Sequence, residues 1–276
     1  MGDNDRGPGE QTKIRSGSFG EVASTYERFR PGPPEAAITW MLPDSPATVV
    51  DLGAGTGAMT RDLVGRVGRI IAVEPDDRMR GILAGSLPEV TALRGTGESI
   101  PLDASSVDAV LASSSWHWME PDRALEETAR VLVPGGTLGV VWAGPDPDGP
   151  FLTQAQAMLS EMSSGPSAPA PGSDRDLDLG TLVMDTDNRV ETVLQIPDDA
   201  PFAQPEQQIL TWDVALTADE LIGLLGTFSW IITMPGDRRT HVIAEARRLL
   251  RDGLGIVGDV TVDVQYRSEA WRTQLT

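Results

Sequence analysis

The stretch that decides the fold reads VVDLGAGTGAMT, residues 49–60. An apolar strand pattern runs through Asp51 into three glycines and continues into a helical pattern. The glycines are Gly53, Gly55 and Gly57. Glycine lets the backbone turn tightly and lets a ligand lie against bare N–H groups at the start of the next helix. The stretch therefore predicts a ligand site between a strand and a helix.

Strand and helix patterns alternate outward from this stretch. The strand patterns are ATVVDLG (47–53), RIIAVE (69–74), VTALRG (90–95), VDAVLASSS (107–115) and TLGVVWAG (137–144). The helix patterns among them are GAMTRDLVGRV (57–67), DDRMRGILAGSL (76–87) and PDRALEETARVL (121–132). Such alternation indicates a parallel sheet covered on both faces, and right-handed crossovers make it a doubly wound α/β fold.

The rest of the chain divides by composition into flanking segments. We expect a flexible arm at 1–18, a helical cover at 19–45, the ligand-binding core at 46–145, a variable loop or cap insertion at 146–205, and C-terminal strands and helices that complete the fold at 206–276. Within the cover, FGEVASTYERFR (19–30) and EAAITWML (35–42) show helical spacing. In the last segment, QQILTWDV (207–214) and VTVDVQYR (260–267) read as strands, and ADELIGLL (218–225) and THVIAEARRLL (240–250) as helices. We expect the first 30 residues and part of 146–205 to close over the ligand.

The charge balance limits the partners. Lys and Arg number 22 and Asp and Glu number 41, so the net charge is −19. This excess opposes phosphate backbones and anionic lipid surfaces, so we expect a small-molecule partner, no nucleic acid and no membrane. The chain has no Cys and two His, which excludes thiol chemistry and predicts no metal site. We expect a cytoplasmic protein, and the oligomeric state stays open.

Two carboxylates help to decide which of two kinds of nucleotide ligand the glycine loop binds. Asp51 lies two residues before the first glycine, where it would repel a dinucleotide pyrophosphate, whereas S-adenosylmethionine has an amino group and no phosphate. Glu74 ends the second strand pattern and is placed to accept hydrogen bonds from both ribose hydroxyls. Two alternatives remain. In the first, both carboxylates are solvated strand ends; in the second, Ala58 completes a G-x-G-x-x-A pattern typical of an NAD(P)-dependent oxidoreductase.

The motif Asp51-Leu-Gly53-Ala-Gly55-Thr-Gly57, followed by Glu74-Pro-Asp, resembles the class I S-adenosylmethionine-dependent methyltransferases. SSSWHWMEPDRAL (113–125) and YERFRPGPP (26–34) are similar to the small-molecule branch that includes ubiquinone-biosynthesis and trans-aconitate methyltransferases. The resemblance covers about residues 17–145 well and 205–272 loosely. It implies a mostly parallel seven-stranded sheet of the Rossmann-like methyltransferase type with helical cap segments.

The resemblance also implies roles for single residues. Asp51 would lie near the methionine amino group, the three glycines would form the floor of the site, and Glu74 would hold the ribose. Met79 would pack on adenine, and Gly97 and Glu98 would meet the adenine edge.

Ser113 would pass close to the methionine moiety. Ser114 and Ser115 stand where relatives often have Gln and Ala, so a substrate contact made by that Gln is not carried over. Tyr26 and Arg30 belong to the first helical pattern and its end. If that helix folds over the cofactor, Arg30 can pair with a carboxylate of the cofactor or of an acidic substrate; otherwise both residues lie on a solvated face.

His117 is the candidate catalytic residue, because a hydroxyl or amine acceptor must lose a proton and imidazole titrates near neutrality. The alternative is a packing role between Trp116 and Trp118. The function we expect is direct in-line transfer of a methyl group from S-adenosylmethionine to a small metabolite, by positioning and exclusion of water. A protein that binds S-adenosylmethionine without catalysis is the remaining alternative.

Overall fold

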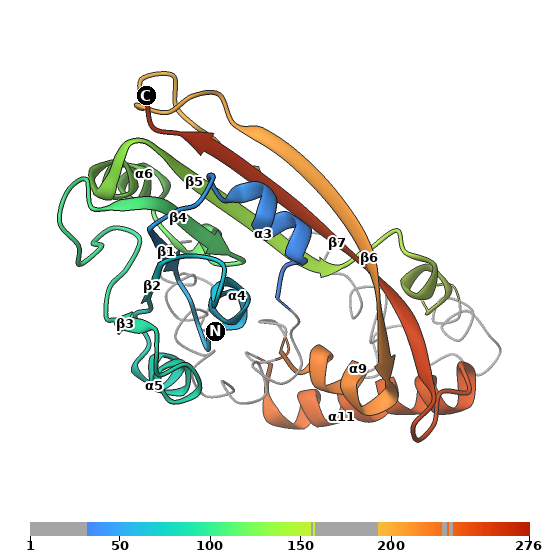
Figure 1. Ribbon diagram of the computed structural model, residues 1–276. Coiled ribbons are helices and arrows are strands. Elements are labelled where there is room, and N and C mark those ends of the chain that lie inside the picture. Colours follow the sequence, from blue (N-terminus) through green and yellow to red (C-terminus); the bar gives the residue numbers. More distant parts are fainter. Residues whose placement is uncertain (1–31, 156, 158–192, 228–230, 232–233) are drawn as a thin grey trace, which may run out of the picture.

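The structure is a computed structural model that describes residues 32–155, 157, 193–227, 231 and 234–276. Within these residues the chain forms a seven-stranded sheet with the order β3, β2, β1, β4, β5, β7, β6 (Figure 1). The strands are β1 (Thr48–Leu52), β2 (Arg69–Val73), β3 (Thr91–Leu93), β4 (Val107–Ser113), β5 (Leu132–Pro145), β6 (Glu206–Thr217) and β7 (Thr261–Gln274).

The direction of the strands confirms the predicted fold class. β1 to β5 pair in parallel, whereas β7 runs antiparallel to both of its neighbours, β5 and β6. The chain winds from β1 through β2 to β3 at one edge, and then returns to place β4 on the other side of β1. The carboxyl ends of β1 and β4 therefore form the topological switch point, which is where ligands bind in open α/β sheets.

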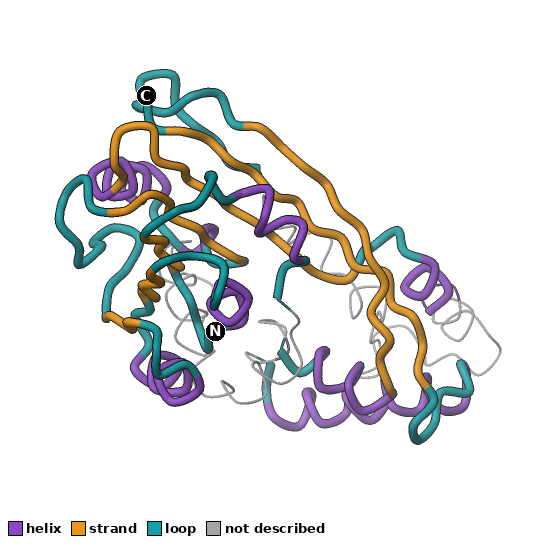
Figure 2. The backbone as a smooth tube through the Cα atoms, in the orientation of Figure 1, coloured by secondary structure: helices purple, strands orange, loops and turns teal. Residues whose placement is uncertain are grey.

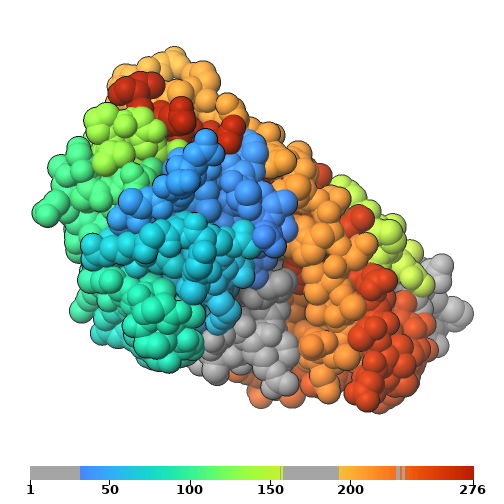
Figure 3. Space-filling view, in the orientation of Figure 1, coloured from blue at the N-terminus to red at the C-terminus, as the bar shows by residue number. Residues whose placement is uncertain are grey.

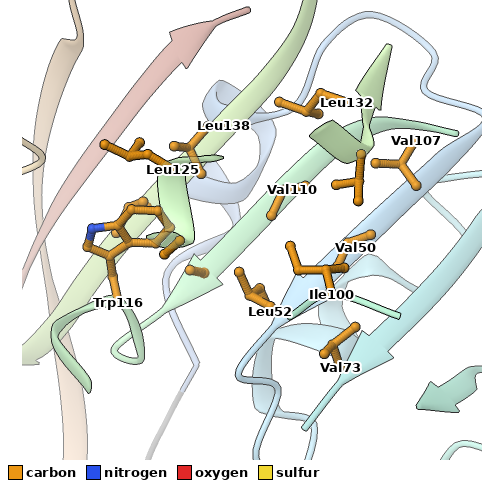
Figure 4. Packing of buried hydrophobic residues seen from close by; sticks show 14 of the residues in the cluster. Val50, Leu52, Val73, Ile100, Val107, Val110, Trp116, Leu125, Leu132 and Leu138 are labelled. Carbon is orange, nitrogen blue, oxygen red and sulfur yellow. The ribbon is translucent and has the colours of Figure 1, made fainter. Parts of the chain in front are cut away.

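Helices cover both faces of the sheet (Figure 1). They are α3 (Glu35–Met41), α4 (Ala58–Leu63), α5 (Asp77–Ser86), the 3₁₀ turn η2 (Trp116–Trp118), α6 (Pro121–Val131), α9 (Ala218–Leu225), α11 (Gly236–Arg248) and the π-helical turn η4 (Leu249–Gly253). On one face, Leu125 of α6 and Trp116 pack with Val50, Val110 and Leu138 of the strands (Figure 4). On the other, α3, α4 and α5 supply the buried apolar side chains Ile38, Met41, Met59, Leu63 and Leu83. Two apolar layers thus enclose the parallel strands, as their continuous apolar runs predict.

Helix α4 is shorter than its sequence pattern. Met59 and Leu63 are buried as predicted, but the helix ends at Leu63, and Val64 already has an extended backbone. Gly65 follows with φ +79°, a left-handed conformation that terminates helices. Val67 packs against the same apolar cluster from outside the helix, so the apolar spacing predicted the buried face correctly and the end of the helix wrongly.

Strand β5 begins earlier than predicted. Val107 of β4 pairs with Leu132, whereas Ala109 pairs with Thr137, so β5 bulges out between these two pairs. The bulge contains Gly135, whose φ is +76°. A bulge of this kind keeps a glycine-rich stretch within a strand although its side chains do not alternate.

The long antiparallel pair of β6 and β7 carries a further packed region. The pairing extends from Glu206 with Arg272 to Thr217 with Thr261, and the end of the pair at Thr217 and Thr261 reaches α9 and α11 (Figure 2). There Phe151, Ile222 and Tyr266 belong to an apolar cluster separate from the two that cover the parallel strands. The space-filling view shows this C-terminal region, coloured orange to red, at the opposite end of the molecule from β3 and α5 (Figure 3). β6 and β7 complete the sheet and also hold these C-terminal helices.

Several sequence expectations lie outside the described residues. These are the arm at 1–18, the helix at 19–30 and most of the insertion at 146–205. The segment boundaries and the closing cover therefore stay predictions. Within the part of the chain that the structure describes, no helix is both long and apolar enough to span a membrane.

Candidate functional site

Three glycines form a tight loop at the carboxyl end of β1. Gly53, Gly55 and Gly57 all have left-handed φ angles, of +70°, +58° and +92°. A Cβ atom added at Gly53 would lie 2.5 Å from the Cβ of Ser115, and one at Gly57 would lie 3.0 Å from Cγ of Leu83. These two positions need glycine for both backbone angle and space.

Gly55 differs from the other two glycines of the loop. The nearest atom to a Cβ at this position would be Sδ of Met79, at 4.0 Å. The space above Gly55 is therefore not filled by the described part of the protein. A ligand can lie there directly against the backbone, as the sequence predicted for this loop.

Glu74 crosses from the end of β2 to the same loop. Its Oε2 accepts a hydrogen bond from the Gly55 N–H at 2.8 Å, and its Oε1 accepts one from the Asp76 N–H at 2.8 Å. Burial raises the pKa of Glu74, against the two hydrogen bonds, which lower it. Each carboxylate oxygen retains a second lone pair. Glu74 thus contacts the glycine loop directly, and its contact with the ribose stays a prediction.

Asp51 is buried beneath the loop, with 1% of its surface exposed. Its Oδ2 accepts a hydrogen bond from Oγ1 of Thr60, in the first turn of α4, at 2.5 Å. The pKa of Asp51 is raised to about 7, because burial and the nearby Glu74 carboxylate raise it more than the hydrogen bonds from Thr60 lower it. A carboxyl group with this pKa is poised to ionise beside a cationic ligand. The alternative that Asp51 and Glu74 are solvated strand ends is wrong, because both are buried.

Thr60 was missed by the sequence reasoning. The helical pattern gave a signal for it, because the first turn of a helix that follows a strand directly lies close to the end of that strand. A hydroxyl at that position can reach a carboxylate near the end of the strand.

Met79 and Glu98 are two of the residues that we predicted to contact adenine. Met79 is buried in the first turn of α5, where its N–H donates to the capping carboxylate of Asp76. Oε1 of Glu98 accepts a hydrogen bond from the Glu120 N–H at 2.7 Å, at the start of α6. Partial burial raises the pKa of Glu98, but hydrogen bonds from Glu120 and Thr96 outweigh it, so the pKa lies below its ordinary value. Glu98 therefore ties its turn to α6, and the adenine contacts of Met79 and Glu98 stay predictions.

Gly97 and the serines at positions 113–115 are the next residues with predicted roles. A Cβ at Gly97 would overlap the side chain of Met119. Ser113 is the last residue of β4, and Ser114 turns the chain with φ +49°. Oγ of Ser115 then donates a hydrogen bond to the Leu52 carbonyl at 2.7 Å. This bond, which the sequence reasoning missed, joins the ends of β4 and β1 at the switch point.

His117 lies in η2, just after β4, at the carboxyl edge of the sheet. Its Nδ1 accepts a hydrogen bond from Nε1 of Trp142 at 3.1 Å, and its ring contacts that of Trp118 with centroids 4.7 Å apart. A ring nitrogen that accepts from an indole N–H has no lone pair left for a substrate proton. The geometry therefore favours the packing alternative over the general base.

Two predicted contacts lie outside the described residues: Tyr26 and Arg30. The structure tests neither. Among the described residues, no group of three or more His, Asp or Glu side chains could hold a metal ion.

The residues around the loop fit S-adenosylmethionine. The open space over Gly55 offers a surface for the ligand, and the buried Asp51 carboxyl suits its ammonium group. Thr56, between the second and third glycines, is buried, and its Oγ1 has no hydrogen-bond partner in the described part of the chain. A buried hydroxyl is normally paired, so a polar ligand group in the loop would satisfy it.

Replacing Glu74 tests this arrangement. We expect Glu74→Ala to weaken the binding of S-adenosylhomocysteine by about 1–3 kcal/mol, because the ribose would lose a charged acceptor. Asp77→Ala is the matched control, since Asp77 is an exposed carboxylate in the next helix, paired with Arg80 at the surface. Calorimetric titration measures both dissociation constants. Equal constants for Glu74→Ala and the control would remove Glu74 from the site.

Comparisons with known proteins agree with this geometry. Residues 50–140 match the family model described as a methyltransferase domain. An uncharacterized methyltransferase of Mycobacterium tuberculosis strain H37Rv is 38% identical over 84% of this chain and 85% of that protein. An uncharacterized methyltransferase-like protein of Schizosaccharomyces pombe is 29% identical over 96% of this chain and 97% of that protein.

A solved structure shares the fold. It is described as a type II methyltransferase from Anaeromyxobacter dehalogenans, with a TM-score of 0.61, 23% identity, and coverage of 89% of this chain and 97% of that one. This similarity, which extends over most of each chain, argues against the oxidoreductase alternative, because these relatives are named methyltransferases. The chain belongs to the class I S-adenosylmethionine-dependent methyltransferases, and the loop of Gly53, Gly55 and Gly57 with Asp51 and Glu74 lies where that family's cofactor is expected.

Proposed function

We propose that the protein transfers the methyl group of S-adenosylmethionine to a small metabolite, as expected for the small-molecule branch that the sequence resembles. The observation that carries the proposal is the junction of Glu74, Gly55 and Asp51 at the topological switch point of the sheet. The net charge of −19 supports a small acceptor in the cytoplasm over tRNA or DNA.

The cofactor supplies a sulfonium, which makes its methyl group ready for displacement. The residues of the chain then have three tasks. Asp51 pairs with the ammonium group, Glu74 holds the ribose, and the bare backbone at Gly55 lets the cofactor lie close. Positioning of this kind contributes several kcal/mol to catalysis because reacting atoms are held in line.

A metabolite screen tests the proposal. The protein is incubated with S-adenosylmethionine labelled in its methyl group and with a fractionated small-molecule extract. We expect label to appear in one or a few metabolites, with Asp77→Ala active and Glu74→Ala strongly reduced at low cofactor concentration. Label found only in tRNA or protein fractions would contradict a small-molecule acceptor, and no transfer with cofactor bound would indicate a binding protein without catalysis.

A further inference from the structure

Two buried polar atoms of the antiparallel strands have no hydrogen-bond partner in the part of the chain that the structure describes. They are Oγ of Ser268 in β7 and Oε1 of Gln208 in β6. Ser268 is fully buried, with 0% of its surface exposed. Buried polar atoms are normally paired, and an unpaired one costs free energy. A ligand group that bonds to both atoms would remove this cost.

The register of β6 and β7 places the two side chains next to each other. Gln208 lies opposite Ala270, and Leu210 lies opposite Ser268. Residues directly opposite in an antiparallel pair point to the same face, and so do residues two apart along one strand. Gln208 and Ser268 are therefore diagonal neighbours on one face, about 7 Å apart. They do not bond to each other, so a small group between them can bond to both.

This face of the sheet is also the face to which Asp51 points. Asp51 pairs with Leu111 of β4, which pairs with Gly139 of β5. Gly139 in turn pairs with Arg272 of β7. Arg272 and Ser268 lie four positions apart in one strand, so their side chains point to the same side. The ammonium end of the cofactor, which we expect at Asp51, therefore faces the same side of the sheet as Ser268.

An open strip of β5 leads from the end of β4 to Ser268. β4 ends at Ser113, which pairs with Val141 of β5. Ser268 pairs with Ala143, two residues further on, where β5 has passed the end of β4 (Figure 1). Ala143 is only partly buried and belongs to none of the apolar clusters that the described residues form. An approach to Ser268 over Ala143 is therefore open from the carboxyl edge of the parallel strands.

The distance to the cofactor suits a small metabolite. Two strand spacings and the rise of two residues place the Cα atom of Ser268 roughly 12 Å from that of Ser113. Ser113 is the residue that we expect beside the methionine moiety. One end of an acceptor molecule can therefore lie at Ser268 while its other end lies at the methyl group.

The side chains around Ser268 on this face are uncharged. They include Gln208, Leu210 and Trp212 of β6, Tyr266 and Ala270 of β7, and Ala143 of β5. The rings of Trp212 and Tyr266 lie against each other, with centroids 5.5 Å apart, and belong to an apolar cluster. The surroundings of the two polar atoms therefore suit an apolar molecule.

A neutral hydroxyl group matches the two polar atoms. Oε1 of Gln208 can only accept a hydrogen bond, whereas the Ser268 hydroxyl can donate one. A ligand hydroxyl can donate to the first and accept from the second. A carboxylate has no hydrogen to donate to Oε1, and an ammonium group would be a desolvated charge with no carboxylate among these neighbours.

We propose that Ser268 and Gln208 form a distal subsite for the methyl acceptor, where they bind a neutral hydroxyl group at the end of an apolar acceptor molecule remote from its methylated atom. The proposal rests on the proposed function and narrows it to a class of acceptor. The subsite determines specificity and positions the acceptor. No bond is made or broken there, and no proton moves.

Thiol labelling tests whether small molecules reach Ser268, without any acceptor. The chain has no Cys, so Ser268→Cys introduces a single thiol. Thr128→Cys is the matched control, because Thr128 in α6 is also fully buried and its Oγ1 also lacks a partner among the described residues. We expect methyl methanethiosulfonate, a small neutral reagent, to modify folded Ser268→Cys at least about tenfold faster than folded Thr128→Cys. Equal rates by mass spectrometry would overturn the subsite.

Removing either polar group should weaken the binding of the acceptor and spare the cofactor. The label-transfer assay uses the extract fraction that takes up label. We expect Ser268→Ala and Gln208→Leu to raise the acceptor concentration at half-maximal rate roughly 3- to 10-fold, with the maximal rate close to that of wild type. Affinity for S-adenosylhomocysteine should not change.

Thr128→Val is the control for these kinetics, since it removes a buried, unpaired hydroxyl far from the proposed subsite. It should leave the half-saturating acceptor concentration unchanged. An unchanged value in both Ser268→Ala and Gln208→Leu, or the same rise in Thr128→Val, would overturn the proposal.

The labelled product reveals the class of acceptor. We expect it to pass through anion and cation exchangers, to be retained on an apolar column, and to shift its retention after acetylation, which reports a remaining free hydroxyl. A charged product, or one without a free hydroxyl, would overturn the proposed acceptor class and leave methyl transfer intact. No label in any fraction would contradict the proposed function itself, whereas thiol labelling would still decide whether the subsite exists.

Discussion

Gly55→Val should abolish detectable binding of S-adenosylhomocysteine, with a loss of roughly 100-fold or more in affinity. Gly55 has φ +58°, a conformation that β-branched residues resist. Its missing side chain also leaves space in which the nearest atom to a Cβ would be Sδ of Met79, at 4.0 Å. A valine would occupy the surface on which the ligand is expected to lie. Titration with S-adenosylhomocysteine measures the loss.

Gly65→Val separates backbone strain from the loss of ligand space. Gly65 has φ +79°, and no atom lies within 4 Å of a Cβ at that position, but it follows α4 and lies outside the loop. Both variants should lose comparable stability from a left-handed valine, about 1–3 kcal/mol. Only Gly55→Val should lose the ligand. Similar affinity losses in the two variants would show that strain, and not the occupied site, causes the effect.

Asp51→Asn should make the protein without ligand more stable and make it bind the cofactor less well. The Asp51 carboxyl is buried, and burial raises its pKa to about 7. At pH 8 the wild-type carboxylate is ionised in both states, and its charge costs free energy in the buried site but not in the unfolded chain. Asparagine removes this cost, so the free energy of unfolding at pH 8 should rise by about 2–4 kcal/mol. Affinity for S-adenosylhomocysteine should fall by roughly 10- to 100-fold, since the ammonium group loses its charged partner.

The sign of the pH dependence follows from the raised pKa. The folded protein binds the Asp51 proton more tightly than the unfolded chain, whose pKa is 3.8. The resulting stability is complete below about pH 4 and is lost as the pH rises to about 7. The stability difference between Asp51→Asn and wild type should therefore grow from pH 4 to pH 7 and then level off. Denaturant unfolding at several pH values measures it, and a difference that does not vary with pH would contradict a buried, late-ionising Asp51.

Cofactor affinity should depend on pH in the opposite direction. An ammonium group favours the ionised Asp51, so wild-type affinity for S-adenosylhomocysteine should increase between pH 6 and pH 8, and Asp51→Asn should flatten this increase. Asp77→Asn is the control, because Arg80 already holds the pKa of that exposed carboxyl below its ordinary value. An equal pH dependence in wild type and Asp51→Asn would assign the effect to another group.

The cofactor loop could be predicted from the sequence because its geometry is local. Gly55 and Glu74 lie at the ends of adjacent parallel strands, and such ends meet at one edge of a sheet. The pattern of strand, glycines, helix and strand therefore predicted that both residues lie at one edge of the sheet, and the hydrogen bond from the Gly55 N–H to Glu74 was not predicted. The same reasoning placed β1 to β5 in the right order of elements, with errors only at ends such as that of α4.

The role of His117 could not be predicted in this way. It depends on Trp142, which lies 25 residues further along the chain, in β5. Neither the spacing nor the composition of WHW indicates which indole will meet the imidazole. The hydrogen bond from Ser115 to the Leu52 carbonyl could not be predicted either, because the two residues lie 63 positions apart in the chain. Contacts of this kind arise from sheet register, and register across β4 and β5 is shifted by a bulge that the apolar pattern did not show.

Calorimetric titration of the wild-type protein at pH 8 with S-adenosylhomocysteine, and in parallel with NAD and NADP, shows which cofactor the loop of Gly53, Gly55 and Gly57 binds. We expect saturable binding of S-adenosylhomocysteine to one site per chain and no binding of either nicotinamide nucleotide. Saturable binding of NAD or NADP, with no heat from S-adenosylhomocysteine, would contradict this expectation.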